Sequence, residues 1–81
     1  MKVRLKLFSI AKDIAGFSEE TIDLMSPANA DDVLEYLTRK DTRFTAWRDS
    51  IRLAVNQQYV PKSHSLNDGD EVAVIPPVSG G

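Results

Sequence analysis

Two short segments near opposite ends of the sequence alternate between apolar and polar residues. Residues 2–8 read KVRLKLF and residues 71–75 read EVAVI, with valine or leucine recurring at every second position. This two-residue period is typical of a strand that buries one face and exposes the other. The chain is therefore expected to build a sheet, and a second layer must cover the apolar side of that sheet.

Between these segments, the apolar spacing predicts both helices and strands. In residues 31–40, Val33 and Leu37 recur at helical spacing, and Glu35 can pair with Arg39 one turn away, so this segment is the predicted main helix. Before this helix, we predict a short helix in residues 9–16, capped by Ser9 and ended by Gly16, and a strand in residues 18–25 with Ile22 and Leu24 facing inward. After it, we predict a short helical turn through Phe44, Trp47 and Ile51 and a strand through Val55. A turn at residues 56–58 and a short strand at Tyr59 and Val60 follow.

This order indicates an α+β fold, in which one main helix packs on one face of a mixed sheet of four or five strands, with short helices beside it. A chain of 81 residues suffices for one domain. A domain of this size buries only roughly 60–65% of its unfolded surface, so the core is thin. We assign residues 1–75 to the domain and residues 76–81 to an extended, flexible tail.

The distribution of charged and apolar residues indicates which kinds of partner are not expected. The formal net charge is -2, and Lys and Arg are dispersed without a basic stripe, so no nucleic acid partner is expected. The opening MKVRLKLFS contains no long apolar run. We therefore expect neither a signal peptide nor a membrane partner, and a cytoplasmic location.

Residue types that often carry chemistry are scarce. The sequence has no cysteine, which removes disulfides, thiolate metal sites and persulfides. The one histidine, His64, lies in the polar stretch PKSHSLNDGD, so we interpret it as a surface residue and expect no metal site. A Gly-rich phosphate loop and a Ser/His/Asp or Cys/His arrangement are also missing, so we expect the chain to be no enzyme by itself.

Strand alternation leaves two apolar residues on the polar side of the predicted sheet. If the first and last strands are neighbours, Phe8 falls on the same side as Ala73 and Ile75. A single exposed aromatic residue is common, but it is also what a contact patch for a partner looks like, and both interpretations of Phe8 remain open. Trp47 is interpreted as a core residue rather than a cofactor contact.

The sequence ends in IPPVSGG. Pro76 and Pro77 lack backbone N–H donors, so the sheet cannot continue through them and the chain should leave it extended. Residues 76–81 span at most about 20 Å, enough to enter a pocket of another protein. Gly80 and Gly81 carry no Cβ and would fit a narrow channel. Two terminal glycines occur by chance in only roughly one chain in two hundred, which weakens the alternative of a frayed terminus but leaves it open.

Several segments together resemble a known family. The first strand, AKDIAG, LAVNQQYV and LNDGDEVAVIPPVSGG are similar to the small, sulfur-carrier subunits of molybdopterin synthase, MoaD-like members of the ubiquitin-like β-grasp superfamily. The resemblance covers nearly the whole chain, and its most specific part is DGDEVA running into PPVSGG. It implies a β-grasp fold and a non-catalytic role in molybdenum cofactor biosynthesis.

In that family the terminal glycine is the sulfur carrier, which here is Gly81 with Gly80 beside it. The resemblance implies that a ubiquitin-activating-like adenylyltransferase adenylates Gly81 with ATP and that a sulfur-donating enzyme then supplies the sulfur of a thiocarboxylate. It also implies a heterotetramer with the large synthase subunit, whose active site would hold the catalytic residues and the cyclic pyranopterin monophosphate. The chain itself would bind no cofactor, and Gly81 is expected to be a free terminus.

The resemblance also implies a contact surface. Phe8, Tyr59 and Ile75 match the apolar patch that the family uses on its outer sheet face, although an aromatic residue is common where this chain has Ile75. The tail residues expected to contact the partner are Pro76, Pro77, Val78 and Ser79.

Other functions fit parts of the same pattern. A terminal Gly-Gly also occurs in ubiquitin-like modifiers, which form isopeptide bonds to lysines, and in the thiamin-pathway sulfur carrier. An adaptor protein with an irrelevant tail is a further alternative. Adducts formed through Gly81, or partner binding that does not need the tail, would distinguish these alternatives.

Overall fold

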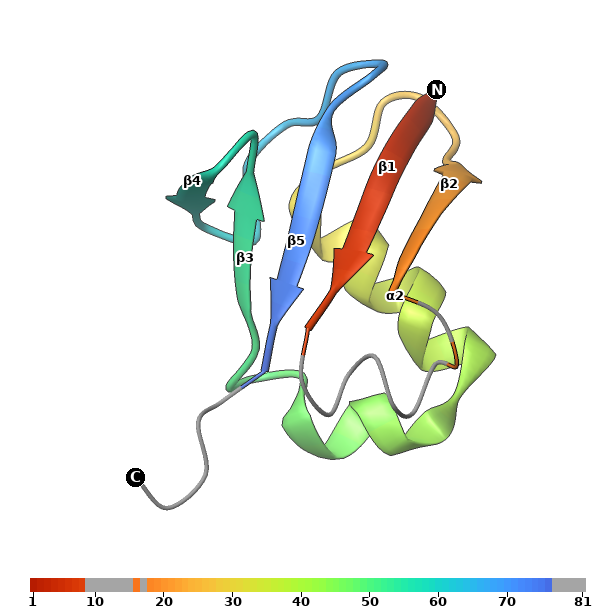
Figure 1. The fold of residues 1–81 in the computed structure, drawn as a ribbon, viewed down its shortest axis with the longest axis vertical. Coiled ribbons are helices and arrows are strands. Elements are labelled where there is room, and N and C mark those ends of the chain that lie inside the picture. Colours follow the sequence, from red (N-terminus) through yellow and green to blue (C-terminus); the bar gives the residue numbers. More distant parts are fainter. Residues whose placement is uncertain (9–15, 17, 77–81) are drawn as a thin grey trace.

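The structure is a computed structural model that describes residues 1–8, 16 and 18–76. Its main element is a five-stranded mixed sheet with one helix packed across one face (Figure 1). The elements in chain order are β1 (Lys2–Leu7), β2 (Glu19–Asp23), α2 (Ala30–Lys40), the 3-10 helix η1 (Thr42–Trp47), β3 (Arg52–Val55), β4 (Gln58–Val60) and β5 (Glu71–Ile75). This arrangement confirms the predicted α+β, β-grasp fold.

The strands are ordered β2-β1-β5-β3-β4 across the sheet. The first and last strands, β1 and β5, are parallel neighbours at its centre, and every other pair is antiparallel. The expected neighbouring of these two strands is confirmed. Because β5 is central, the chain leaves the sheet from its middle rather than from an edge (Figure 1).

The core lies between the sheet and α2. Residues Val3, Leu5 and Leu7 of β1 are at most 2% exposed, as the alternation predicts. They face apolar side chains of α2, including Leu34 and Leu37, which are also fully buried. Burying such side chains supplies most of the stabilisation of a small domain.

The helix α2 begins one residue earlier than predicted because Asn29 caps it. The Asn29 side chain accepts a hydrogen bond from the Asp32 backbone N–H at 3.1 Å, and the Asp32 carboxylate accepts one from the Asn29 N–H at 2.7 Å. This reciprocal pair satisfies two backbone donors that an uncapped helix would leave free. The predicted pair between Glu35 and Arg39 is present at 3.7 Å.

Other predictions need small corrections. The 3-10 helix ends at Trp47, but a hydrogen-bonded turn continues from it, since the Ile51 N–H donates to the Trp47 carbonyl at 3.0 Å, and Ile51 is buried ahead of β3. Trp47 is half-buried against the core, edge-on to Phe44 at 6.2 Å between ring centroids. The predicted turn at residues 56–58 is one residue shorter, because Gln58 already belongs to β4 and pairs with Val55.

The predicted short helix in residues 9–16, with its cap Ser9, lies outside the described residues except for Gly16. Gly16 has a φ of 83°, the left-handed conformation expected of a residue that ends a helix. The strand predicted in residues 18–25 is shorter, since β2 spans Glu19–Asp23. Of its predicted inward pair, Ile22 is buried, and Leu24, just after β2, is partly buried against the core. No helix in the part of the chain that the structure describes is long and apolar enough to span a membrane.

Candidate functional site at the outer sheet face and the tail exit

The face of the sheet opposite α2, called the outer face below, carries an apolar patch. The sheet register aligns Ala73 of β5 with Ala54 of β3, and Ala54 with Tyr59 of β4. Side chains of aligned residues point to the same side. Leu7 aligns with Val74, so Phe8 comes next to Ile75 at the end of the parallel pair. We define the apolar patch by its members, Phe8, Ala54, Tyr59, Ala73 and Ile75.

The structure brings together the three predicted contact residues of the domain. Tyr59 is 65% exposed and Phe8 is 49% exposed, which is high for large apolar side chains. Ile75 is partly exposed between them in the strand order. Met25 is the third large apolar side chain exposed in the described residues, and it follows β2, whose end pairs with the start of β1, away from Phe8.

The other half of the outer face is covered by ion pairs. Lys2 pairs with Asp23 at 3.3 Å, Lys6 pairs with Glu71 at 2.8 Å, and Arg4 pairs with Glu19. The hydrogen bond from Lys6 holds the pKa of the Glu71 carboxyl below its ordinary value. The three cations of β1 are therefore neutralised within the sheet.

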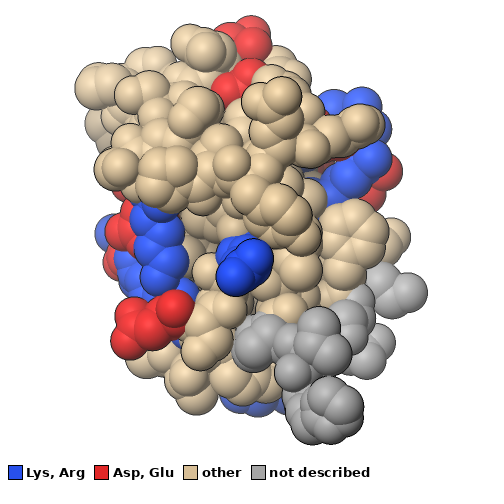
Figure 2. Space-filling view, turned by 90° about the vertical axis from the view of Figure 1, so that its left-hand side faces the viewer, with Lys and Arg blue, Asp and Glu red and all other residues tan. Residues whose placement is uncertain are grey.

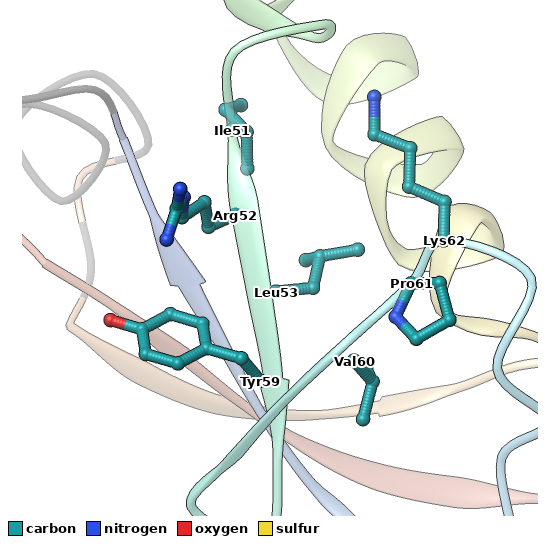
Figure 3. A pocket seen from close by; sticks show the side chains of 7 residues that line it. All are labelled: Ile51, Arg52, Leu53, Tyr59, Val60, Pro61 and Lys62. Carbon is teal, nitrogen blue, oxygen red and sulfur yellow. The ribbon is translucent and has the colours of Figure 1, made fainter.

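The edge of the sheet at β3 and β4 contains a shallow groove beside the apolar patch. It has a volume of about 310 Å³ and a floor of apolar side chains, including Ile51, Leu53 and Val60 (Figure 3). Arg52 and Tyr59 both extend to the same side of β3, and the Arg52 guanidinium carbon lies 5.7 Å from the Tyr59 ring centroid. Figure 2 looks onto this edge, where most of the surface is uncharged and charged groups gather mainly toward the margins.

The tail begins beside this patch. Ile75, the last residue of β5, pairs with Arg52, and Pro76 after it is buried in the domain. Pro76 therefore holds the start of the tail in place, and its contact with a partner stays a prediction. The remaining predicted tail residues, Pro77, Val78, Ser79, Gly80 and Gly81, lie outside the described residues.

Sequence reasoning missed Arg52 and Ala54 as members of this surface. The segment RLAV alternates, so Arg52 and Ala54 could have been assigned to the face opposite Leu53 and Val55. Their position beside Ile75 could not be assigned in that way, because it depends on the pairing of β3 with β5.

Groups suited to metal binding are missing from residues 1–8, 16 and 18–76, where no three His, Asp or Glu side chains gather to hold an ion. His64 is exposed, as predicted. The site thus consists of an apolar patch, one neighbouring guanidinium and a tail. These groups can hold a second protein.

Known proteins resemble this chain over its whole length. The sequence profile of the ThiS family matches residues 5–81. A molybdopterin synthase sulfur carrier subunit from Chlamydomonas reinhardtii is 34% identical over 83 residues, covering 100% of both chains. A solved structure from Pyrococcus furiosus, provisionally named molybdopterin converting factor subunit 1, is 32% identical with a TM-score of 0.84, covering 96% of this chain and 99% of the other. The crystal structure of SAMP1 from Haloferax volcanii is 27% identical with a TM-score of 0.82, and covers 100% of both chains.

Proposed function

Because this chain belongs to the ThiS family, we propose that it is the sulfur-carrier subunit of a molybdopterin synthase. The observation that carries the proposal is the full-length similarity to a protein of that name, which spans 100% of both chains. The position of the tail supports it, because the chain leaves a central strand directly beside an exposed apolar patch. A partner that covers the patch would receive the tail at the same time.

In the proposed reaction, Gly81 carries the sulfur. Its carboxylate oxygen attacks the α-phosphorus of ATP on an adenylyltransferase, and pyrophosphate leaves. Sulfide-level sulfur, released by a donor enzyme as hydrosulfide, then attacks the carbonyl carbon of the acyl adenylate; the C–O bond to AMP breaks, AMP leaves, and a thiocarboxylate is produced. In the large subunit, this sulfur would form a C–S bond to a side-chain carbon of a cyclic pyranopterin monophosphate while a C–O bond at that carbon breaks and its oxygen leaves. Water then cleaves the bond between the sulfur and the glycyl carbonyl carbon, which leaves the sulfur on the pterin and restores the carboxylate.

The side chains of this chain have a binding role in the proposal. The chain has no cysteine, so a persulfide on it is impossible and the carboxyl end is the available sulfur handle. Phe8, Tyr59 and Ile75 would pack on the large subunit and on the adenylyltransferase in turn. The catalytic residues would lie on those partners.

Mass spectrometry tests the sulfur-carrier proposal. After incubation with the adenylyltransferase, ATP and a sulfur donor, the intact chain should gain about 16 Da, the difference between oxygen and sulfur at one position. A variant lacking Gly81 and a variant with one alanine added after Gly81 should gain nothing while melting at the same temperature as the unchanged chain. A chain that gains no mass, or full synthase activity in the variant lacking Gly81, would contradict the proposal.

A second candidate function is protein modification, which the similarity to SAMP1, a small archaeal modifier protein, favours. The activated acyl group would then be attacked by a lysine amine of a target protein, with an isopeptide bond as the product. Expression of the tagged chain in its host should yield covalent adducts that disappear when Gly81 is deleted. If no adducts form while the thiocarboxylate does, the sulfur-carrier function alone is supported.

A further inference from the structure

Among the residues that the structure describes, Arg52 has no countercharge. In the part of the chain that the structure describes, each other Lys or Arg forms an ion pair or, in the case of Lys62, donates to the Arg48 backbone carbonyl at 2.8 Å. The contact that Arg52 makes is with the Tyr59 ring, 5.7 Å from its centroid. Its guanidinium remains free to bind a carboxylate from outside.

Arg52 lies at the exit of the tail and beside the apolar patch, where a partner protein would contact it. Arg52 pairs with Ile75, so it stands where the tail leaves the sheet. Ala54, which is 7% exposed, and the partly exposed Ala73 have short side chains, and Arg52 lies next to them on the outer face. A protein that covers the apolar patch removes water from the neighbouring Arg52, and a desolvated guanidinium without a partner opposes binding.

We propose that Arg52 binds an aspartate or glutamate of the protein that receives the tail, and that this pair selects that protein. The proposal rests on the proposed function and specifies its partner, a large synthase subunit that presents one carboxylate surrounded by apolar side chains. The cation–π contact of Arg52 with the Tyr59 ring, at 5.7 Å from the ring centroid, favours this role because it restrains the guanidinium before binding.

The rest of the outer face does not compete for this carboxylate. Lys2, Arg4 and Lys6 are already held by acidic residues of β2 and β5, and an incoming carboxylate there would meet Asp23, Glu19 or Glu71. Attraction for an acidic group is therefore confined to the side of the face at β3 and β4. The Arg52 guanidinium also repels a protein that presents a Lys or Arg at this position. The charge of Arg52 would therefore disfavour binding of such proteins as well as favour the partner with a carboxylate.

Binding of the full-length chain to the purified large subunit tests the proposal. Isothermal titration should give a Kd about tenfold or more weaker for Arg52→Leu and weaker still for Arg52→Glu, while Arg52→Lys keeps part of the affinity. The matched control is Arg39→Glu, since Arg39 is an exposed arginine on α2, on the other side of the sheet. Circular dichroism and melting temperature should show that all variants fold.

Two further measurements separate a charge contact from lost packing. Raising the salt concentration from about 0.05 to 0.5 M should weaken binding of the unchanged chain to the large subunit more than it weakens binding of Arg52→Leu. One Asp→Lys or Glu→Lys substitution on the large subunit should restore binding to Arg52→Glu.

The outcomes are distinguishable. Equal Kd values for Arg52→Glu and Arg39→Glu, with tight binding by the unchanged chain, would overturn the role of Arg52 and leave the proposed function standing. If the unchanged chain does not bind the large subunit, both the role of Arg52 and the proposed function are overturned. An affinity loss confined to Arg52 variants, with a reduced salt dependence, would support the proposal.

Discussion

At the scale of single residues, the turn between β3 and β4 contains two residues with a left-handed backbone conformation, Asn56 and Gln57, which differ in their side-chain contacts. Asn56, with a φ of 51°, receives a hydrogen bond from the Glu71 N–H on its side-chain oxygen at 3.1 Å, and its amide nitrogen donates to Asp70 at 3.0 Å. The side chain thus fastens the turn to the start of β5. Gln57, with a φ of 71°, is exposed and has no comparable contact in the described residues.

This difference predicts a stabilising substitution. Gln57→Gly should raise the free energy of unfolding by about 1 kcal/mol, because glycine adopts a left-handed φ without the steric cost that a Cβ adds. Urea unfolding followed by circular dichroism measures the change. The control is Gln58→Gly, one residue later in the regular strand β4, which should lower the same free energy. Equal effects at both positions would contradict this explanation.

At the scale of elements, Arg48 connects α2 to the segment that leads into β3. Its guanidinium donates to Glu35 at 2.8 Å and to Asp31 at 2.9 Å, both on α2. Its backbone carbonyl accepts from Lys62, which follows β4. The hydrogen bond from Arg48, followed by its charge, holds the pKa of the Glu35 carboxyl below its ordinary value of 4.5.

The lowered pKa predicts how Arg48 contributes to stability as a function of pH. A carboxyl whose pKa is lower in the folded state stabilises the fold fully above its unfolded value and loses that contribution as the pH falls through the folded value. The difference in unfolding free energy between the unchanged chain and Arg48→Met should therefore be largest near about pH 6 and shrink below about pH 4.5. Urea titrations over this range measure it.

Arg52→Met is the control for the pH experiment because Arg52 makes no ion pair with the described residues. The difference in unfolding free energy between Arg52→Met and the unchanged chain should stay constant over the same pH range. A difference for Arg48→Met that also stays constant would show that the Arg48 contacts stabilise the fold by packing rather than by charge.

At the scale of the whole molecule, the sheet order places the last strand in the middle of the fold. β5 pairs with β1 on one side and β3 on the other, and its residues Val72 and Val74 are fully buried. Pro76 is buried as well, directly after the strand. The packed part of the described chain therefore extends to Pro76.

The extent of the packed part predicts that two truncations have different effects. A chain ending at Pro76 should melt within about 2 °C of the full chain, because the core and the sheet pairing are complete. A chain ending at Ala73 loses the buried Val74 and the end of a central strand, so it should fail to fold cooperatively. Calorimetry measures both. A drop of more than about 5 °C for the longer truncation would show that residues 77–81 stabilise the domain.

The sequence by itself determined the features that depend on neighbours along the chain. The alternation in residues 2–8 and 71–75 predicted two strands with one buried face, and the spacing of Val33 and Leu37 predicted α2. These predictions succeed because strands and helices repeat every two and every 3.6 residues, so burial is recorded in local order. The same alternation placed Phe8 and Ile75 on the outer face.

Only the tertiary structure decided which distant residues meet. The pairing of β3 with β5 brings Arg52 to Ile75 at the exit of the tail, and the hairpin of β3 and β4 brings Tyr59 under the Arg52 guanidinium. Strand pairing also determines the ion pairs of Lys2, Arg4 and Lys6, because it places acidic residues of β2 and β5 beside β1. The physical reason is that strand pairing joins residues far apart in sequence, and no local period records the register in which they pair.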